Sequence, residues 1–256
     1  MTIRYEVSGP LARLTIDRPD ALNAFDIPDL KELAAAFDRA AADDAVRVLI
    51  LTGTGRAFSV GADIKAMDRM TAEEFAEAAS LYQSLARQAR ALAKPIVGAL
   101  NGYTLGGGLE IALICDLRIA ARSARIGLPD AELGFSPTGG LTYLMGRAVG
   151  LGRALHLAMT GEMLDAAEAE RIGLVTKVVD DEALEAEALA LGEQLASYPS
   201  TGMRNIKHAF YTAAEADFET VLNLEEELDS ICYASPETRE RLAAFLASRK
   251  KCKPDG

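Results

Sequence analysis

Two periods of apolar positions alternate along the first half of the chain. Short β-branched runs predict strands, and apolar residues three or four positions apart predict helices. The predicted strands cover residues 3–7, 11–16, 46–51, 95–100, 117–120 and 125–128. The predicted helices cover residues 28–42, 71–93 and 106–115. This β-α alternation with apolar strands favours a largely parallel sheet that is covered on both faces.

From about residue 139 onward the pattern is almost entirely helical. One further strand is expected at 174–179, among helices at 139–149, 152–160, 165–173, 182–197, 201–212, 218–233 and 236–250. No Pro-, Gly- or Ser-rich linker interrupts the chain. We therefore expect an α/β core domain over residues 1–196, followed by a helical C-terminal region over residues 197–256.

The charge balance narrows the choice of partners. The 256 residues carry 27 Lys and Arg against 38 Asp and Glu, which gives a formal net charge of −11. Nucleic-acid and anionic-membrane binding usually rely on a basic surface, so this balance argues against both. An anionic small ligand held in a local pocket remains compatible with it.

Cysteine usage and the apolar runs indicate the compartment. Cys115, Cys232 and Cys252 lie far apart and form no C-x-x-C pair, so neither a disulfide framework nor a zinc site is indicated. Met1–Val7 has no apolar segment typical of a signal peptide. The most apolar run, Leu105–Ile114, is far shorter than the ~20 residues that a membrane span needs. We expect a soluble protein of a reducing, cytoplasm-like compartment.

Several enzyme classes can be set aside from missing motifs. The chain has no G-x-x-x-x-G-K-[ST] phosphate loop, no complete dinucleotide fingerprint and no G-x-S-x-G elbow. Its two histidines, His156 and His208, stand alone, and a lone histidine is more often structural than catalytic. Acid–base chemistry is therefore expected to use carboxylates.

Glu110 is the most informative single residue. It lies in the otherwise apolar run Leu105–Cys115, which predicts a buried helix. A carboxylate buried there needs a partner or a proton, and its pKa should be perturbed, which makes it a catalytic candidate. The alternative is a carboxylate that caps the preceding turn or lies at an exposed helix end.

Three glycines, Gly106 to Gly108, precede this helix. Glycines let a backbone approach a ligand closely, and the free N–H groups of a helix N-terminus stabilise negative charge such as that of an enolate. The loop Ala57–Lys65 follows a predicted strand and could supply a second N–H donor. The alternative for the triplet is close helix–strand packing or a flexible turn.

Two further carboxylates follow the predicted strand that ends at residue 128. Glu110 with Asp130 or Glu132 could form a paired-carboxylate site for water addition, in which one carboxylate activates water and the other handles a proton. The alternative is that Asp130 and Glu132 are solvated loop residues.

Four segments together resemble the enoyl-CoA hydratase/isomerase (crotonase) superfamily. They are IDRP with ALNA within 16–24, AFSVGADIK at 57–65, KPIVGALNGYTLGGGLEIALICDLRIAA at 94–121 and LPDAELGFSPTGG at 128–140. GLV at 173–175 and AFL at 244–246 also fit. The similarity spans almost the whole chain, and the combination is highly specific. It implies an α/β, crotonase-like (ClpP/crotonase) spiral of ββα units with a helical C-terminal trimerisation region.

The resemblance also implies roles for particular residues. The N–H groups of Ala62 and Gly107 would form an oxyanion hole, and Glu110 would be the first of two water-holding carboxylates. The second position is Asp130, one methylene shorter than the family's glutamate. Glu132 is its rival if the segment is extended, because residues two apart then point to one side. Thr138 replaces an aspartate that some isomerase- or dehalogenase-like members carry.

For the CoA moiety, the resemblance implies binding by Lys65, and by Phe245 and Arg249 in the C-terminal tail. The implied activity is enoyl-CoA hydration: water adds syn to a trans-2-enoyl-CoA and gives a 3-hydroxyacyl-CoA. An isomerase or another acyl-CoA lyase or hydrolase of this family is the nearest alternative. A catalytically weak binding homologue is the non-enzyme alternative. No metal or separate cofactor is implied, since coenzyme A is part of the substrate, and homotrimers or hexamers are expected.

Overall fold

The computed structural model describes the backbone of residues 2–251 and the side chains of residues 2–248. The chain forms two compact units, one reaching Glu193 and the other beginning at Gln194, so that they divide inside helix α8 (Leu184–Ala196). This division falls three residues before the boundary expected from the sequence.

A six-stranded sheet forms the base of the first unit. Its strand order is β1-β2-β3-β5-β7-β10, with bounds Ile3–Ser8, Leu11–Ile16, Val48–Gly53, Ile96–Leu100, Leu117–Ala121 and Lys177–Val179. β1 and β2 pair antiparallel, and every later neighbour pairs parallel. The central strands β3 and β5 are buried almost throughout, as expected for parallel strands that are covered on both faces. The predicted parallel, covered sheet is confirmed.

A second sheet has four short strands in the order β4-β6-β8-β9, with bounds Ala57–Ser59, Tyr103–Leu105, Arg125–Gly127 and Leu164–Asp165. β4, β6 and β8 are parallel, and β9 pairs antiparallel to β8. The chain therefore alternates between the sheets, because β3 precedes β4, β5 precedes β6 and β7 precedes β8. This alternation, with helices between the strand pairs, forms the expected spiral of ββα units.

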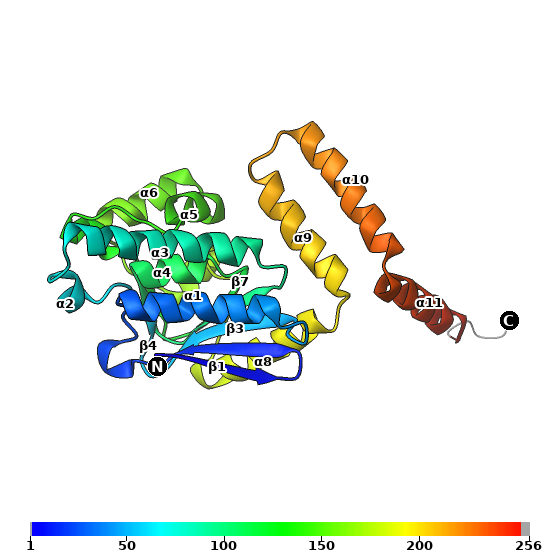
Figure 1. Ribbon diagram of the computed structural model, residues 1–256, viewed down its shortest axis with the longest axis horizontal. Coiled ribbons are helices and arrows are strands. Elements are labelled where there is room, and N and C mark those ends of the chain that lie inside the picture. The colour runs from blue at the N-terminus through cyan, green and yellow to red at the C-terminus, as the bar shows by residue number, and fades with distance from the viewer. Residues whose placement is uncertain (1, 252–256) are drawn as a thin grey trace. The chain divides into compact units, whose positions relative to one another are not determined.

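Two long helices with defined starts lie side by side over the first unit: α1 (Ile27–Ala42) and α3 (Ala72–Ala91) (Figure 1). Asp26 and Thr71 cap them, and both form reciprocal capping boxes with the residue three positions on. The pair Thr71 and Glu74, three positions apart, also has the sequence pattern of such a box. The remaining helices of this unit are α2 (Ile64–Met67), α4 (Gly107–Leu113), α5 (Leu141–Val149), α6 (Leu151–Thr160), α7 (Ala166–Arg171) and most of α8.

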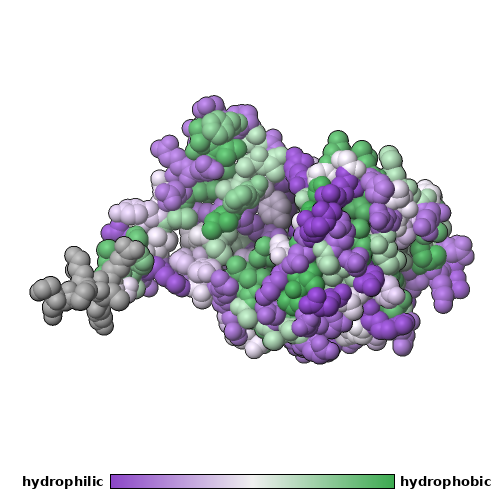
Figure 2. All heavy atoms as spheres, turned by 180° about the vertical axis from the view of Figure 1, so that it is seen from behind, coloured by the Kyte–Doolittle hydropathy of each residue, from purple (hydrophilic) through white to green (hydrophobic). Residues whose placement is uncertain are grey.

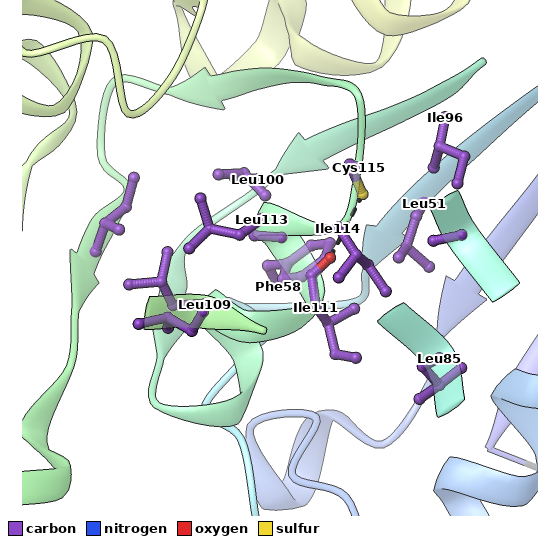
Figure 3. Close-up of a cluster of buried hydrophobic side chains, with 14 of the residues drawn as sticks. Leu51, Phe58, Leu85, Ile96, Leu100, Leu109, Ile111, Leu113, Ile114 and Cys115 are labelled. Carbon is purple, nitrogen blue, oxygen red and sulfur yellow. Dashed lines mark hydrogen bonds between the residues drawn. The ribbon is translucent and has the colours of Figure 1, made fainter. Parts of the chain in front are cut away.

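Helix α4 lies in the hydrophobic core. Leu109, Ile111, Leu113, Ile114 and Cys115 are all nearly inaccessible to solvent, and they pack among side chains of β3, β5 and α3 (Figure 3). The core therefore surrounds the helix that carries Glu110. At such packing density the position of this helix is tightly fixed.

The second unit consists of helices α9 (Ser200–Ala213), α10 (Phe218–Ala234) and α11 (Pro236–Lys251), preceded by the end of α8. These helices expose large apolar side chains, and apolar surface is visible among polar groups in Figure 2. Within the described residues, each helix is too short or too polar to cross a membrane.

The predicted strand at 174–179 is correct only in its second half. β10 begins at Lys177 because the N–H groups of Leu174 and Val175 bond back to the carbonyl of Ala169, at the end of α7. A turn thus replaces the first part of the strand.

Candidate active site

The segments singled out in the sequence line one cavity of about 290 Å³ in the first unit. Ala62, Gly107, Glu110 and Asp130 all contribute to its wall. Helix α3 supplies one apolar side through a stripe of residues, and Phe25, Leu30, Met67 and Met70 add further apolar surface. A cavity with apolar walls and a few convergent polar groups is typical of a small-molecule site.

Two backbone N–H groups are available at this cavity. Ala62 pairs with Phe25 in an isolated parallel bridge, whose hydrogen bonds use the N–H groups of Phe25 and Asp63. The N–H of Ala62 therefore takes no part in the pairing. Gly107 is the first residue of α4, where an N–H has no acceptor within the helix. The two groups can donate to one anionic oxygen.

Glycines make this arrangement possible. Gly61 has a φ of +87°, and a Cβ placed on it would lie 2.5 Å from the Gly107 nitrogen. A Cβ placed on Gly108 would lie 2.0 Å from the carbonyl oxygen of Ser59. The two interpretations of the glycine triplet are thus compatible, since close packing of α4 against β4 also brings its N-terminus to the cavity.

Glu110 is buried, with 3% of its surface exposed. Its Oε1 accepts a hydrogen bond from the Thr138 N–H at 2.5 Å, and its Oε2 accepts one from the Thr138 hydroxyl at 2.9 Å. Burial raises the pKa of Glu110 and outweighs these two bonds, and the charge of Asp130 raises it further. The alternative of a cap or an exposed helix end is therefore wrong.

Asp130 lies in a short 3-10 helix, Pro129–Leu133. Its Oδ2 is buried without a hydrogen-bond partner among the described residues, and a Cβ placed on Gly106 would lie 3.5 Å from it. Burial raises the pKa of this carboxyl group. Asp130 is therefore not a fully solvated loop residue: it lines the cavity, and one of its carboxylate oxygens is shielded from solvent.

Glu132 is not the alternative partner. The expectation that it points to the side of Asp130 requires an extended segment, but the segment is helical. Glu132 is exposed and absent from the cavity wall, and a Cβ placed on Gly161 would lie 3.2 Å from its Oε1. Its side chain thus lies towards the end of α6.

The sequence gives little indication of two other residues at the site. Tyr82 has the helical spacing of an ordinary core residue of α3, yet it lines the cavity, and its buried hydroxyl has no hydrogen-bond partner among the described residues. Thr138 is noted only as a replacement for aspartate, yet it holds both oxygens of Glu110. The contact joins positions 28 residues apart, so no local pattern could reveal it.

An ion-pair network supports the loop that carries Ala62. Arg18 contacts Asp63 at 2.7 Å and Asp29 at 3.3 Å. Asp63 also caps α2 by accepting from the N–H groups of Lys65 and Ala66. Burial alone would raise the pKa of Asp63, but the hydrogen bonds from Ala66 and Arg18 hold it below its ordinary value.

The residues expected to bind CoA lie in different units. Lys65 is exposed on α2, whose Ile64 and Met67 line the cavity. Phe245 lies on α11 and is 54% exposed. The side chain of Arg249 lies outside the described residues. The structure therefore places Lys65 on a helix that borders the cavity.

Taken together, the ββα spiral, the two N–H groups and the carboxyl groups of Glu110 and Asp130 define an α/β protein whose cavity combines donors suited to an anion with groups suited to proton transfer. A sequence model of the family described as Enoyl-CoA hydratase/isomerase matches residues 6–253. The chain belongs to this family.

Individual relatives agree with this assignment. A crotonyl-CoA hydratase of Syntrophomonas wolfei is 39% identical over 97% of this chain and 96% of its own length. A 1,2-epoxyphenylacetyl-CoA isomerase of Escherichia coli is 37% identical over 96% of each chain. The crystal structure of an enoyl-CoA hydratase from Bacillus anthracis superposes with a TM-score of 0.92 at 32% identity, over 100% of this chain and 98% of that one.

Proposed function

We propose that the protein is an enoyl-CoA hydratase, which adds water syn across the C2–C3 double bond of a trans-2-enoyl-CoA. The observation that carries this proposal is the pairing of Glu110 and Asp130, two carboxyl groups with raised pKa, at one cavity with the N–H groups of Ala62 and Gly107. The hydratase names of several relatives that are 36–39% identical over nearly the whole chain support it.

In this mechanism the thioester oxygen accepts hydrogen bonds from Ala62 and Gly107. Glu110 and Asp130 hold a water molecule, and one of them takes its proton as the water oxygen bonds to C3. The π electrons move to the thioester oxygen, where the two N–H groups and the positive end of α4 stabilise the enolate. A carboxylic acid of the pair then delivers a proton to C2, so that one water molecule is added in all.

The raised pKa values suit this proton relay. A carboxyl group that works as both base and acid needs a pKa closer to the working pH than that of an exposed carboxylate. The hydrogen bonds from Thr138 keep Glu110 in place while its protonation changes.

The proposed CoA contacts are Lys65 beside the cavity and the tail residues Phe245 and Arg249. A tail would contribute to the site of another subunit if the protein forms homotrimers or hexamers, which we also propose. The exposed apolar residues of the C-terminal helices, Phe210, Phe218 and Tyr233 among them, support self-association. No metal or separate cofactor enters this mechanism, and we propose a reducing, cytoplasm-like compartment from the cysteine pattern.

An isomerase that moves the double bond is the second candidate. The family description, which names isomerases beside hydratases, favours it, and so does the short side chain of Asp130, because an isomerase shuttles a proton and holds no water. Formation of a 3-enoyl-CoA in place of a 3-hydroxyacyl-CoA would establish this candidate and reject hydration.

The test follows the loss of enoyl-thioester absorbance with crotonyl-CoA and longer trans-2-enoyl-CoAs. We expect Glu110→Gln to lower kcat by about 10²–10⁴, the range for loss of a positioned acid–base group. Asp130→Asn should lower it more than Glu132→Gln, whose side chain lies outside the cavity wall. Full activity of Glu110→Gln, or an inert wild type with every enoyl-CoA, would reject the proposal.

A further inference from the structure

Tyr82 is the most deeply buried residue of the stripe by which α3 faces the cavity. Phe75, Ala78, Ala79 and Tyr82 follow helical spacing and all line the cavity. Phe75 is 39% exposed and stacks on Phe135, with ring centroids 5.6 Å apart, whereas Tyr82 is only 6% exposed. The stripe thus runs from a partly open aromatic pair to a buried phenol.

The Tyr82 hydroxyl has no hydrogen-bond partner among the described residues. An unsatisfied buried hydroxyl destabilises the fold unless something bound at the site pairs with it. A phenylalanine would fill the same space without this cost.

The position of the hydroxyl links it to the reaction site. A Cβ placed on Gly107 would lie 2.5 Å from the Tyr82 Oη, and a Cβ placed on the adjacent Gly106 would lie 3.5 Å from the Asp130 Oδ2. One buried donor and one buried acceptor, both unpartnered, therefore flank consecutive residues at the start of α4. Both residues also line the cavity.

The phenol stays protonated under ordinary conditions. Burial is the main cause that raises the pKa of Tyr82, and the charges of Glu110, Asp130 and Asp29 raise it further. Tyr82 can therefore donate a hydrogen bond, and it does not act as a base.

We propose that Tyr82 is a third catalytic residue, whose hydroxyl donates a hydrogen bond to the oxygen of the water that adds to C3. The inference rests on the proposed hydratase function. Glu110 and Asp130 can accept hydrogen bonds from the two O–H groups of this water. If the Tyr82 hydroxyl donates to one lone pair of the water oxygen, the other lone pair is directed at C3. No proton leaves the phenol, so the atom balance of the hydration is unchanged.

The thioester oxygen is the less fitting acceptor for this hydroxyl. The N–H groups of Ala62 and Gly107 already supply two donors for that oxygen. Tyr82 shares the cavity wall with Glu110 and Asp130, the two groups assigned to the water. The two possibilities differ in a spectroscopic signature, which the test below uses.

The test compares Tyr82→Phe with Tyr5→Phe. The hydroxyl of Tyr5 is also buried and unpartnered among the described residues, but Tyr5 is not part of the cavity wall. Both variants remove one oxygen and no bond to the protein, so thermal melts should match or exceed the wild type. For crotonyl-CoA we expect Tyr82→Phe to lower kcat about 10- to 100-fold with KM changed less than about threefold. Tyr5→Phe should keep the wild-type kcat.

A binding measurement separates the water from the thioester oxygen. The absorbance of 4-aminocinnamoyl-CoA shifts to longer wavelength when its carbonyl is polarised, and its amino group slows hydration. We expect Tyr82→Phe to keep the full shift of the wild type, because the N–H donors are intact. A shift that shrinks along with kcat would place the hydroxyl on the thioester oxygen and overturn the inference.

The remaining outcomes also decide the question. A wild type active on crotonyl-CoA with Tyr82→Phe within twofold of it would overturn the role of Tyr82 and leave the proposed function standing. A wild type inert with every enoyl-CoA would overturn both. Equal losses of kcat in Tyr82→Phe and Tyr5→Phe, or a lower melting temperature of Tyr82→Phe alone, would assign the hydroxyl a structural role and reject the inference.

Discussion

Gly61 determines whether the two N–H donors can lie beside each other. Its backbone has φ +87°, a region that favours glycine, and its Cα packs against the Gly107 nitrogen. A side chain at this position would have to displace the backbone of α4 or that of its own loop. The atoms nearest to its Cβ all belong to the backbone, so no flexible side chain could move aside.

We therefore predict that Gly61→Ala lowers kcat with crotonyl-CoA by about 10² or more, the loss typical of one misplaced oxyanion donor. Gly150→Ala is the matched control, since Gly150 has φ +82° and open space around its Cα. The control should lose about 1 kcal/mol of stability from backbone strain alone and retain kcat. Steady-state kinetics with thermal melts measure both; similar kinetics for the two variants would contradict the assignment of the N–H pair.

Asp130 connects catalysis with stability. Its pKa in the folded chain is raised by burial, so the folded chain holds this proton more tightly than the unfolded chain does. This tighter binding of the proton stabilises the folded chain. The stabilisation is fully present below the pKa that Asp130 has in the unfolded chain, and it is lost as the pH rises through the pKa that Asp130 has in the folded chain. Near neutral pH the ionised carboxylate therefore destabilises the fold.

We predict that the stability of Asp130→Asn relative to wild type increases as the pH rises above about 4, the ordinary pKa of an aspartate, because asparagine does not titrate. Urea unfolding at several pH values measures it. Glu132→Gln changes an exposed residue of the same 3-10 helix, and its free energy of unfolding should stay within about 0.5 kcal/mol of the wild-type value at every pH. A difference between Asp130→Asn and wild type that does not change with pH would show that burial does not raise the pKa of Asp130.

Among the elements, the end of β2 and the starts of α1 and α2 meet at Arg18. The side chains of Asp29 and Asp63 are 8% and 14% exposed, and among residues 2–248 the opposite charge that contacts both is the Arg18 guanidinium. The loop with Ala62 is thus positioned by an ion-pair network and by the cap of α2.

We predict that Arg18→Met destabilises the protein by about 1–3 kcal/mol, because it leaves two largely buried carboxylates without a counter-charge. It should also lower kcat, since Ala62 adjoins Asp63. Arg13→Met is the control: it breaks an ion pair with Glu185 that lies largely in solvent and should change stability by less than about 1 kcal/mol. Equal urea midpoints of the two variants would contradict a structural role for the network.

The elements also show what a sequence can specify. The period of apolar positions predicts α1, α3 and the long strands, because this signal extends over many residues. β4, β6 and β9 have two or three residues each, too few to show a period, and tertiary pairing alone forms them. At the site, Glu110 is predictable as one charge in an apolar helix, whereas Tyr82 resembles an ordinary core aromatic residue and Thr138 acts through a distant contact.

For the whole molecule, the net charge of −11 opposes the binding of a polyanion such as CoA. Lys65 is the exposed cation on the helix that borders the cavity. Local positive charge must therefore offset the overall field.

We predict that Lys65→Ala raises KM for crotonyl-CoA about 3- to 10-fold at low salt with kcat unchanged, and that the difference shrinks near 1 M salt, where the Debye length is about 3 Å. Lys177→Ala makes the same change in net charge, but Lys177 pairs with Glu187 on the surface. It should leave KM nearly constant. Equal effects of the two variants would show that only the total charge matters.

The alternation of the chain between two sheets has a further consequence. β4, β6 and β8 are neighbours in the small sheet and lead in turn to the segments with Ala62, with Gly107 and Glu110, and with Asp130. In the proposed mechanism, the first two turns of the spiral bind the thioester oxygen through Ala62 and Gly107. The second turn also carries Glu110, and the third contributes Asp130. Evolution can therefore change the reaction by substitutions in one short segment, while descendants inherit the same means of binding a thioester.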